Sequence, residues 1–210
     1  MNRHLYHSFS TPLYINPIPL DVINPLKIHL NQEDIETNSG DPSHFGSHSK
    51  DTYLLNNPKY SNLKNYVLEE STAYADEVLN YNYIDYKLTQ SWISIKNPNE
   101  EHFPHTHSNS LVSGVIFYEE PTPDTPSLFF DRDDKYTKTL LAHKHKKSYN
   151  NLFPQSLEIP YKNNLLIIFP SYQLHAVEMN KSNQIRKSLS FNIIPKNGFG
   201  SEDKLNELKF

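Results

Sequence analysis

The chain has 210 residues, 36% of them hydrophobic, so it is long enough to bury a core of its own. A net charge of −4 argues against non-specific nucleic-acid binding, and zero cysteine excludes disulfides, thiolate nucleophiles and thiolate metal ligands. No apolar run approaches the roughly eighteen residues of a membrane span, and the first residues lack a secretory pattern, so we expect a cytoplasmic protein.

The first part of the chain predicts short strands, a loop and then one helix. Short apolar pieces cut by prolines predict one or two strands within residues 1–30, and the polar stretch 31–52 predicts a long loop. Residues 58–80 begin with a proline and predict a helix whose apolar face packs on a sheet. That face, with one polar break, consists of Leu63, Tyr66, Val67, Glu70, Tyr74 and Val78.

The middle of the chain predicts strands separated by turns. Alternating β-prone residues predict a strand over 83–96, and further strands are predicted over 111–118 and 127–130. The lysine-rich stretch 131–150 contains a second His-x-His pair, which we interpret as part of a solvated loop. Neighbouring ammonium groups disfavour a bound dication, so we do not expect a metal there.

Two strands are predicted near the end of the chain. Residues 165–169 are apolar on both faces, which indicates a strand inside a sheet, and 186–194 alternate between polar and apolar residues. The polar face of the second strand, which meets either solvent or a barrel interior, holds Arg186, Ser188, Ser190 and Asn192. Together these elements predict a mainly β protein with supporting helices, a sandwich or a jelly-roll barrel. We predict one domain over 1–210, with its core at about 83–195, because no repeat or linker divides the chain.

A histidine-rich segment precedes the strand 111–118. Side chains two residues apart in an extended segment project to the same face, so His105 and His107 can hold one transition-metal ion between them. A third ligand must come from elsewhere in the chain. The best candidate is His175, in FPSYQLHAV, and the lack of cysteine restricts any metal site to His, Asp or Glu.

Three segments in this order resemble the iron(II)- and 2-oxoglutarate-dependent oxygenases, and most closely a group of them from bacteria and phages. The segments are SWISIKNPNEEHFPHTHSNSLVSGVIFYEEP, NNLLIIFPSYQLHAV and IRKSLSFNI, and the likeness covers roughly residues 88–195. The resemblance implies a double-stranded β-helix, the cupin-like jelly roll, with Fe(II) held by His105, His107 and His175. It also implies 2-oxoglutarate as co-substrate and hydroxylation of an unknown small-molecule or protein substrate, with release of succinate and carbon dioxide.

The resemblance further implies which residues bind 2-oxoglutarate. Arg186 matches the arginine that binds the far carboxylate, and a guanidinium can donate two parallel hydrogen bonds to such a group. Ser188 lies on the same face of the predicted strand and could assist. Tyr118 is near the position where related enzymes place a hydroxyl on the co-substrate. Asn192 belongs to the same motif, with no role assigned from the sequence.

One departure from the superfamily pattern leaves the metal ligands and the reaction open. The superfamily uses two histidines and a carboxylate, whereas His107 stands at the middle ligand position. The chain could therefore be a three-histidine iron dioxygenase that does not use 2-oxoglutarate, or its third ligand could instead be His102, Asp131 or Asp133. It could also be a cupin-like protein that binds a metal or a sugar without turnover, or a zinc hydrolase with Glu101 as general base. Neither the prime substrate nor the oligomeric state can be predicted from the sequence.

Overall fold

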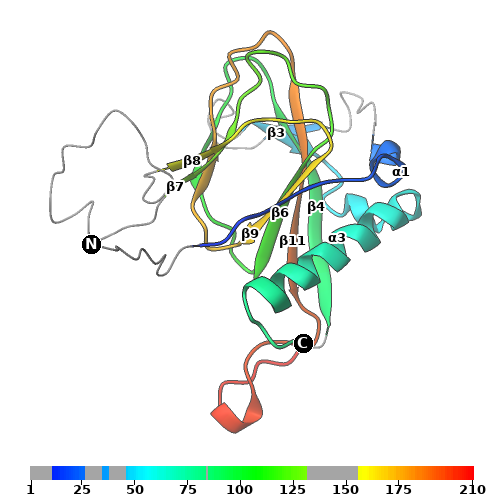
Figure 1. The fold of residues 1–210 in the computed structure, drawn as a ribbon, viewed down its shortest axis with the longest axis vertical. Coiled ribbons are helices and arrows are strands. Elements are labelled where there is room, and N and C mark those ends of the chain that lie inside the picture. Colours follow the sequence, from blue (N-terminus) through cyan, green and yellow to red (C-terminus); the bar gives the residue numbers. More distant parts are fainter. Residues whose placement is uncertain (1–10, 27–34, 38–45, 84, 132–155) are drawn as a thin grey trace, which may run out of the picture.

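The computed structural model shows two antiparallel β-sheets, with one helix of several turns packed on the larger sheet (Figure 1). The residues that it describes are 11–26, 35–37, 46–83, 85–131 and 156–210. Asp133 and most of the predicted loop 131–150, including its His-x-His pair, lie outside these residues. None of the helices in the described part of the chain has the length and apolarity needed to span a bilayer.

The larger sheet has seven strands, in the order β1-β9-β6-β11-β4-β3-β2. Their bounds are β1 Tyr14–Pro17, β2 Ile35–Thr37, β3 Ser47–Ser49, β4 Tyr86–Lys96, β6 Val112–Phe117, β9 Leu165–Pro170 and β11 Arg186–Pro195. The predicted strands 83–96, 111–118 and 186–194 are confirmed as β4, β6 and β11. The apolar run 165–169 is also confirmed as a strand inside the sheet, because β9 pairs with β1 on one side and β6 on the other.

The smaller sheet has four strands, in the order β5-β10-β7-β8. Their bounds are β5 His102–His105, β7 Leu128–Asp131, β8 Ser156–Ile159 and β10 His175–Val177. β7 confirms the predicted strand 127–130, and β5 is the extended histidine segment. β8 and β10 are not predicted from the sequence, because strands of four and three residues give only a weak alternating signal.

The prediction of one long loop over 31–52 is wrong, because β2 and β3 lie within it and extend the larger sheet beyond β4. Ser47 and Ser49 of β3 are buried although they are polar. The Ser49 hydroxyl accepts a hydrogen bond from the backbone N–H of Ile93 at 3.0 Å, and donates one to the Asp51 carbonyl at 2.7 Å. The buried positions of β3 thus carry hydroxyl side chains where apolar ones are usual. For this reason the polar composition of residues 31–52 indicated a loop.

The predicted helix 58–80 is confirmed, with a change of helix type along it. Its parts are a 3-10 turn at Pro58–Tyr60, the α-helix α3 at Ser61–Ala73 and a π-helical end at Tyr74–Val78. Leu63, Val67 and Tyr74 are buried against the larger sheet, as predicted. Val78 is 45% exposed, because the wider π-helical turn shifts the angular positions that an α-helix would give.

Short helical turns complete the described chain. They are α1 Leu20–Ile23 and the 3-10 turns Asn24–Leu26, Leu54–Asn56 and Glu202–Lys204. The described part of residues 1–30 therefore holds the strand β1 and the turn α1, in line with the prediction of one or two short strands there.

Two apolar clusters hold the layers together. One lies between α3 and the outer face of the larger sheet, and includes Leu63, Phe191 and Ile193. The other lies between the two sheets and joins Phe169 of β9 to Phe130 of β7, whose rings are 5.0 Å apart. The sheets thus face each other across an apolar filling, which is the double-stranded β-helix predicted from the sequence.

The polar face of β11 is turned to the space between the sheets and not to solvent. Its exposed fractions are 4% for Arg186, 2% for Ser188, 7% for Ser190 and 8% for Asn192. The alternating pattern of the sequence did not decide between solvent and the interior of a barrel. This face of β11 is buried because the smaller sheet covers it, whereas a single sheet would leave it in water.

Candidate active site

Three histidines from different elements converge on one point. His105 ends β5 and His175 begins β10, and the two are direct partners in the antiparallel ladder. His107 lies in the link from β5 to β6, where its backbone N–H donates to the Ser171 carbonyl at 2.9 Å. The ligand nitrogens of the three lie within 4.8 Å of one another, and Nε2 of His105 is 3.3 Å from Nε2 of His107. Nitrogens about 2.1 Å from a common ion lie roughly 3 Å apart, so this group could hold one metal ion.

The other ring nitrogen of each histidine faces a hydrogen-bond acceptor. The contacts are His105 Nδ1 to Phe103 O at 2.8 Å, His175 Nδ1 to Gln173 O at 2.9 Å, and His107 Nδ1 to both Ser113 Oγ and Asn192 Oδ1 at 2.8 Å. A carbonyl oxygen cannot donate, so the imidazole carries its proton on Nδ1 in these contacts. Each ring therefore presents the lone pair of Nε2 to the centre, as a metal ligand must.

Burial keeps these rings neutral. It is the largest cause lowering the pKa of all three, taking that of His107 to about 4 and that of His175 well below its ordinary value. A metal binds the unprotonated imidazole, so the rings have no proton to lose at neutral pH. The donor set, the tautomers and the protonation state thus all fit a metal such as Fe(II).

The remaining ligands considered from the sequence lie outside this cluster. Among the described residues it is the one group of three or more potential ligands with converging atoms, and it contains only histidines. His102 is not a member; its ring stacks on that of His105, with 4.1 Å between the centroids. Asp131, at the end of β7, and Glu101, before β5, are not members either. Asp133 lies outside the described residues.

Arg186, at the start of β11, is a buried cation with free donors. Burial lowers its pKa to about 10, so it stays protonated at neutral pH. Nη1 donates to Ser188 Oγ at 3.1 Å, but Nε and Nη2 are buried with no hydrogen-bond partner in the described part of the chain. These two nitrogens form one edge of the guanidinium, the edge that matches the two oxygens of a carboxylate. A buried donor without a partner is destabilising, so the site fits an anionic ligand such as 2-oxoglutarate.

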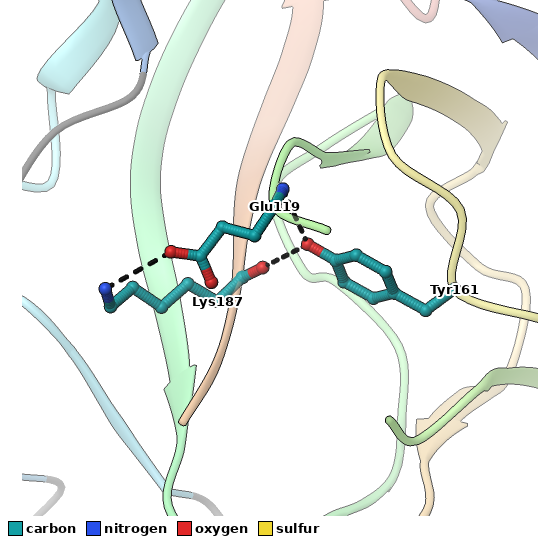
Figure 2. Close-up of polar contacts among 3 residues, drawn as sticks. All are labelled: Glu119, Tyr161 and Lys187. Atoms are coloured by element: carbon teal, nitrogen blue, oxygen red, sulfur yellow. Dashed lines mark hydrogen bonds and ion pairs between the residues drawn. The ribbon is translucent and has the colours of Figure 1, made fainter. Parts of the chain in front are cut away.

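Two aromatic rings support the guanidinium. Its central carbon lies 5.3 Å from the ring centroid of Phe117 and 5.2 Å from that of Tyr161. The Tyr161 hydroxyl donates to the Lys187 carbonyl at 2.7 Å and accepts from the Glu119 N–H at 3.2 Å, and Lys187 Nζ pairs with the Glu119 carboxylate at 3.2 Å (Figure 2). Sequence reasoning missed Tyr161, because it precedes β9 in a segment without periodicity.

Tyr118 lies one residue beyond the end of β6, within electrostatic reach of Arg186. Its side chain packs in the cluster beneath α3, whereas the side chain of its neighbour Phe117 lies between the sheets. One step along a strand turns a side chain to the opposite face. The structure brings Ser188 together with Arg186, and Tyr161 is the tyrosine whose ring lies beside the guanidinium. A role for Tyr118 in binding the co-substrate stays a prediction.

A jelly roll with a histidine cluster and a buried arginine between its sheets defines a class of metal-dependent enzymes. The chain belongs to the 2OG-Fe(II) oxygenases: its residues 90–192, which include the three histidines and Arg186, match the family described as "Putative 2OG-Fe(II) oxygenase". No sequence among the curated proteins matches the chain.

Several solved structures share the fold at low sequence identity. A Pseudomonas putida prolyl-4-hydroxylase has a TM-score of 0.56 at 13% identity, with 87% of this chain and 93% of that chain covered. HygX from Streptomyces hygroscopicus, with nickel and 2-oxoglutarate bound, has a TM-score of 0.59 at 12% identity, covering 89% and 84%. SnoN, a non-heme alpha ketoglutarate dependent epimerase from nogalamycin biosynthesis, has a TM-score of 0.62 at 10% identity, covering 89% and 80%. At these identities the likeness concerns the fold alone.

Proposed function

We propose that the chain is an Fe(II)- and 2-oxoglutarate-dependent dioxygenase that hydroxylates a small-molecule or protein substrate and releases succinate and carbon dioxide. The observation that carries this proposal is the convergence of three neutral imidazoles, each with Nε2 turned to one point. Membership of the 2OG-Fe(II) oxygenases supports iron as the metal and 2-oxoglutarate as the co-substrate. A cytoplasmic location is an expectation from the sequence alone.

In this proposal His105, His107 and His175 hold the metal through Nε2. Iron with bound 2-oxoglutarate supplies the activation of dioxygen and the oxidative decarboxylation that the protein itself cannot perform. The chain contributes the position of the ligands, and its apolar filling between the sheets keeps water from the reacting groups.

Arg186 binds the carboxylate of 2-oxoglutarate that is remote from the metal. Nε and Nη2 donate to its two oxygens, while Nη1 stays on Ser188. Phe117 and Tyr161 hold the guanidinium in place, so the fork is already oriented before the co-substrate arrives. Three neutral ligands leave the metal one charge more positive than two histidines and a carboxylate would, which favours a dianionic co-substrate.

Purified protein loaded with iron(II) under ascorbate tests the proposal. We expect it to bind 2-oxoglutarate and to form succinate slowly even without the prime substrate. Zinc-loaded protein is the matched control, because zinc has no redox chemistry and should yield no succinate. Hydrolysis with zinc would favour a hydrolase, and thiol-dependent uptake of dioxygen without 2-oxoglutarate would favour a three-histidine thiol dioxygenase. Metal binding with neither reaction would indicate a cupin-like binding protein.

A further inference from the structure

We propose that Asn192 and Ser113 act together as positioning residues for His107. They hold its imidazole with the proton on Nδ1, and so let a neutral ring serve as a metal ligand where a carboxylate is the commoner choice. The inference rests on the proposed function for the identity of the metal, but its geometry involves only described side chains of this chain.

The two residues make a buried acceptor pair beneath the ring. Asn192 of β11 and Ser113 of β6 are direct partners in the antiparallel ladder, and are 8% and 0% exposed. Ser113 Oγ donates to Asn192 Oδ1 at 2.8 Å, and His107 Nδ1 lies 2.8 Å from both oxygens. An amide oxygen only accepts, so the ring nitrogen facing it carries the proton and the lone pair stays on Nε2.

A chain of hydroxyl groups supports this pair from behind. Ser113 Oγ is 2.7 Å from Ser171 Oγ, which donates to Ser110 Oγ at 2.8 Å, and Ser110 Oγ donates to the Val112 carbonyl at 3.0 Å. Ser171 and Ser110 thus direct their protons away from Ser113, whose own proton goes to a neighbouring oxygen and whose lone pair faces His107. The Ser171 carbonyl also accepts the backbone N–H of His107, so backbone and ring are fixed by one network.

A β-bulge sets the position of Asn192. Gln90 lies opposite Asn192 and Leu88 lies opposite Ile193, so Thr89 is an extra residue on β4. Thr89 Oγ1 donates to the backbone carbonyl of Asn192 at 3.1 Å, which ties the bulge to this residue. Bulges commonly re-aim a side chain beside a site, and this one lies where the polar face of β11 reaches the histidines.

The other two histidines are held differently. His105 and His175 each face a backbone carbonyl two residues earlier, that of Phe103 and that of Gln173. Only His107, at the position that departs from the superfamily pattern, is held through side chains. The hydrogen bonds that orient the His107 ring can therefore be removed by side-chain substitution, without any change to the backbone.

Trp92 offers a direct readout of metal binding. It is the single tryptophan of the chain, and its ring centroid lies 6.2 Å from that of His107. Cobalt(II) at the histidine cluster should quench its fluorescence, so metal affinity can be measured without turnover or substrate.

The experiment is a cobalt(II) titration of Ser113→Ala, Asn192→Ala and the double variant, with fluorescence of Trp92 as the readout. Each single variant keeps one acceptor and should lose at most about threefold in affinity, whereas the double variant should lose about 10- to 100-fold. The loss in the double variant should exceed the product of the single losses. Ser190→Ala is the matched control, since this buried serine shares the strand and face of Asn192, and its affinity should equal that of the wild type.

A rescue variant at Asn192 distinguishes a positioning role of this residue from a packing role. Combined with Ser113→Ala, Asn192→Asp keeps an acceptor oxygen and should bind cobalt at least as tightly as Ser113→Ala alone, while Asn192→Ala should not. If the double alanine variant does not fold, the Asp combination is compared with Ser113→Ala alone, and weaker cobalt binding by the Asp combination would overturn the inference. A wild-type affinity in the folded double variant, or equal affinities for the Asp and Ala combinations, would overturn the inference alone. Wild-type protein that binds no cobalt would overturn the proposed metal site as well.

Discussion

On its outer face β11 presents Phe191 and Ile193 to the core beneath α3, whereas on its inner face it presents Arg186 and Asn192 to the space between the sheets. The outer side chains are apolar and fully buried, so they stabilise the fold by leaving water. The inner side chains are buried polar groups, and such groups destabilise unless they find partners. The residues that stabilise the fold and the residues of the site thus lie on opposite faces of β11. Substitutions on the outer face should change stability, and substitutions on the inner face should change metal or co-substrate binding.

Phe191→Ala should have the largest effect on stability. The ring is 0% exposed and packs so closely on Gly114 that a Cβ there would lie 2.1 Å from Phe191 Cζ. Removing it should lower the free energy of unfolding by about 3–5 kcal/mol, measured by urea denaturation. Under conditions where the variant is folded, its affinity for cobalt should be unchanged. A loss of affinity as large as that of an inner-face variant would contradict the separation of the two faces.

His107→Ala should have the converse effect. With two ligands left, metal affinity should fall by more than the roughly hundredfold that loss of a supporting hydrogen bond can cause, while the metal-free protein unfolds at nearly the same urea concentration. His107→Asp should still bind iron, because a carboxylate restores the commoner ligand set. His102→Ala is the control, and should keep the metal. Full iron affinity in His107→Ala would refute the three-histidine site.

Arg186→Lys should weaken 2-oxoglutarate binding and leave iron affinity nearly unchanged. Lysine keeps the charge but loses the two-pronged donor, and a charge-assisted hydrogen bond contributes about 1.5–3 kcal/mol, or roughly ten- to a hundredfold in affinity. Calorimetric titration of 2-oxoglutarate into the metal-loaded protein measures this. Lys196→Ala is the matched control, since this side chain is 59% exposed near the other end of the same strand and should have no effect. An equal dissociation constant for wild type and Arg186→Lys would rule out the proposed role.

Tyr161→Phe should have the smallest effect. It removes the hydroxyl that joins Lys187 to Glu119 but keeps the ring on the guanidinium. We expect a loss of about 0.5–1.5 kcal/mol in unfolding free energy and a smaller change in 2-oxoglutarate affinity than Arg186→Lys causes. Thermal unfolding and the same titration measure both. A fall in affinity as large as that of Arg186→Lys would show that the hydroxyl itself contacts the co-substrate.

The sequence was sufficient where the signal is local. Alternation and apolar runs predicted β4, β6, β9 and β11, and helical spacing predicted α3. The absence of cysteine and the His-x-His pair reduced the possible metal ligands to a few residues, and His105, His107 and His175 do lie together. These predictions need only the chemistry of a residue and of its neighbours along the chain.

The tertiary structure alone decided which side chains meet across strands. β3 and β10 exist because neighbouring strands pair with them, so no pattern within three residues could predict them. Tyr161 lies beside the guanidinium of Arg186 although no local pattern points to it, because the chain fold and not residue type determines which side chains meet. Asn192 lies 79 residues from Ser113 and 85 from His107 along the chain, and gains its role only when β11 and β6 pair. What a side chain touches is set by this long-range pairing, which composition and periodicity do not record.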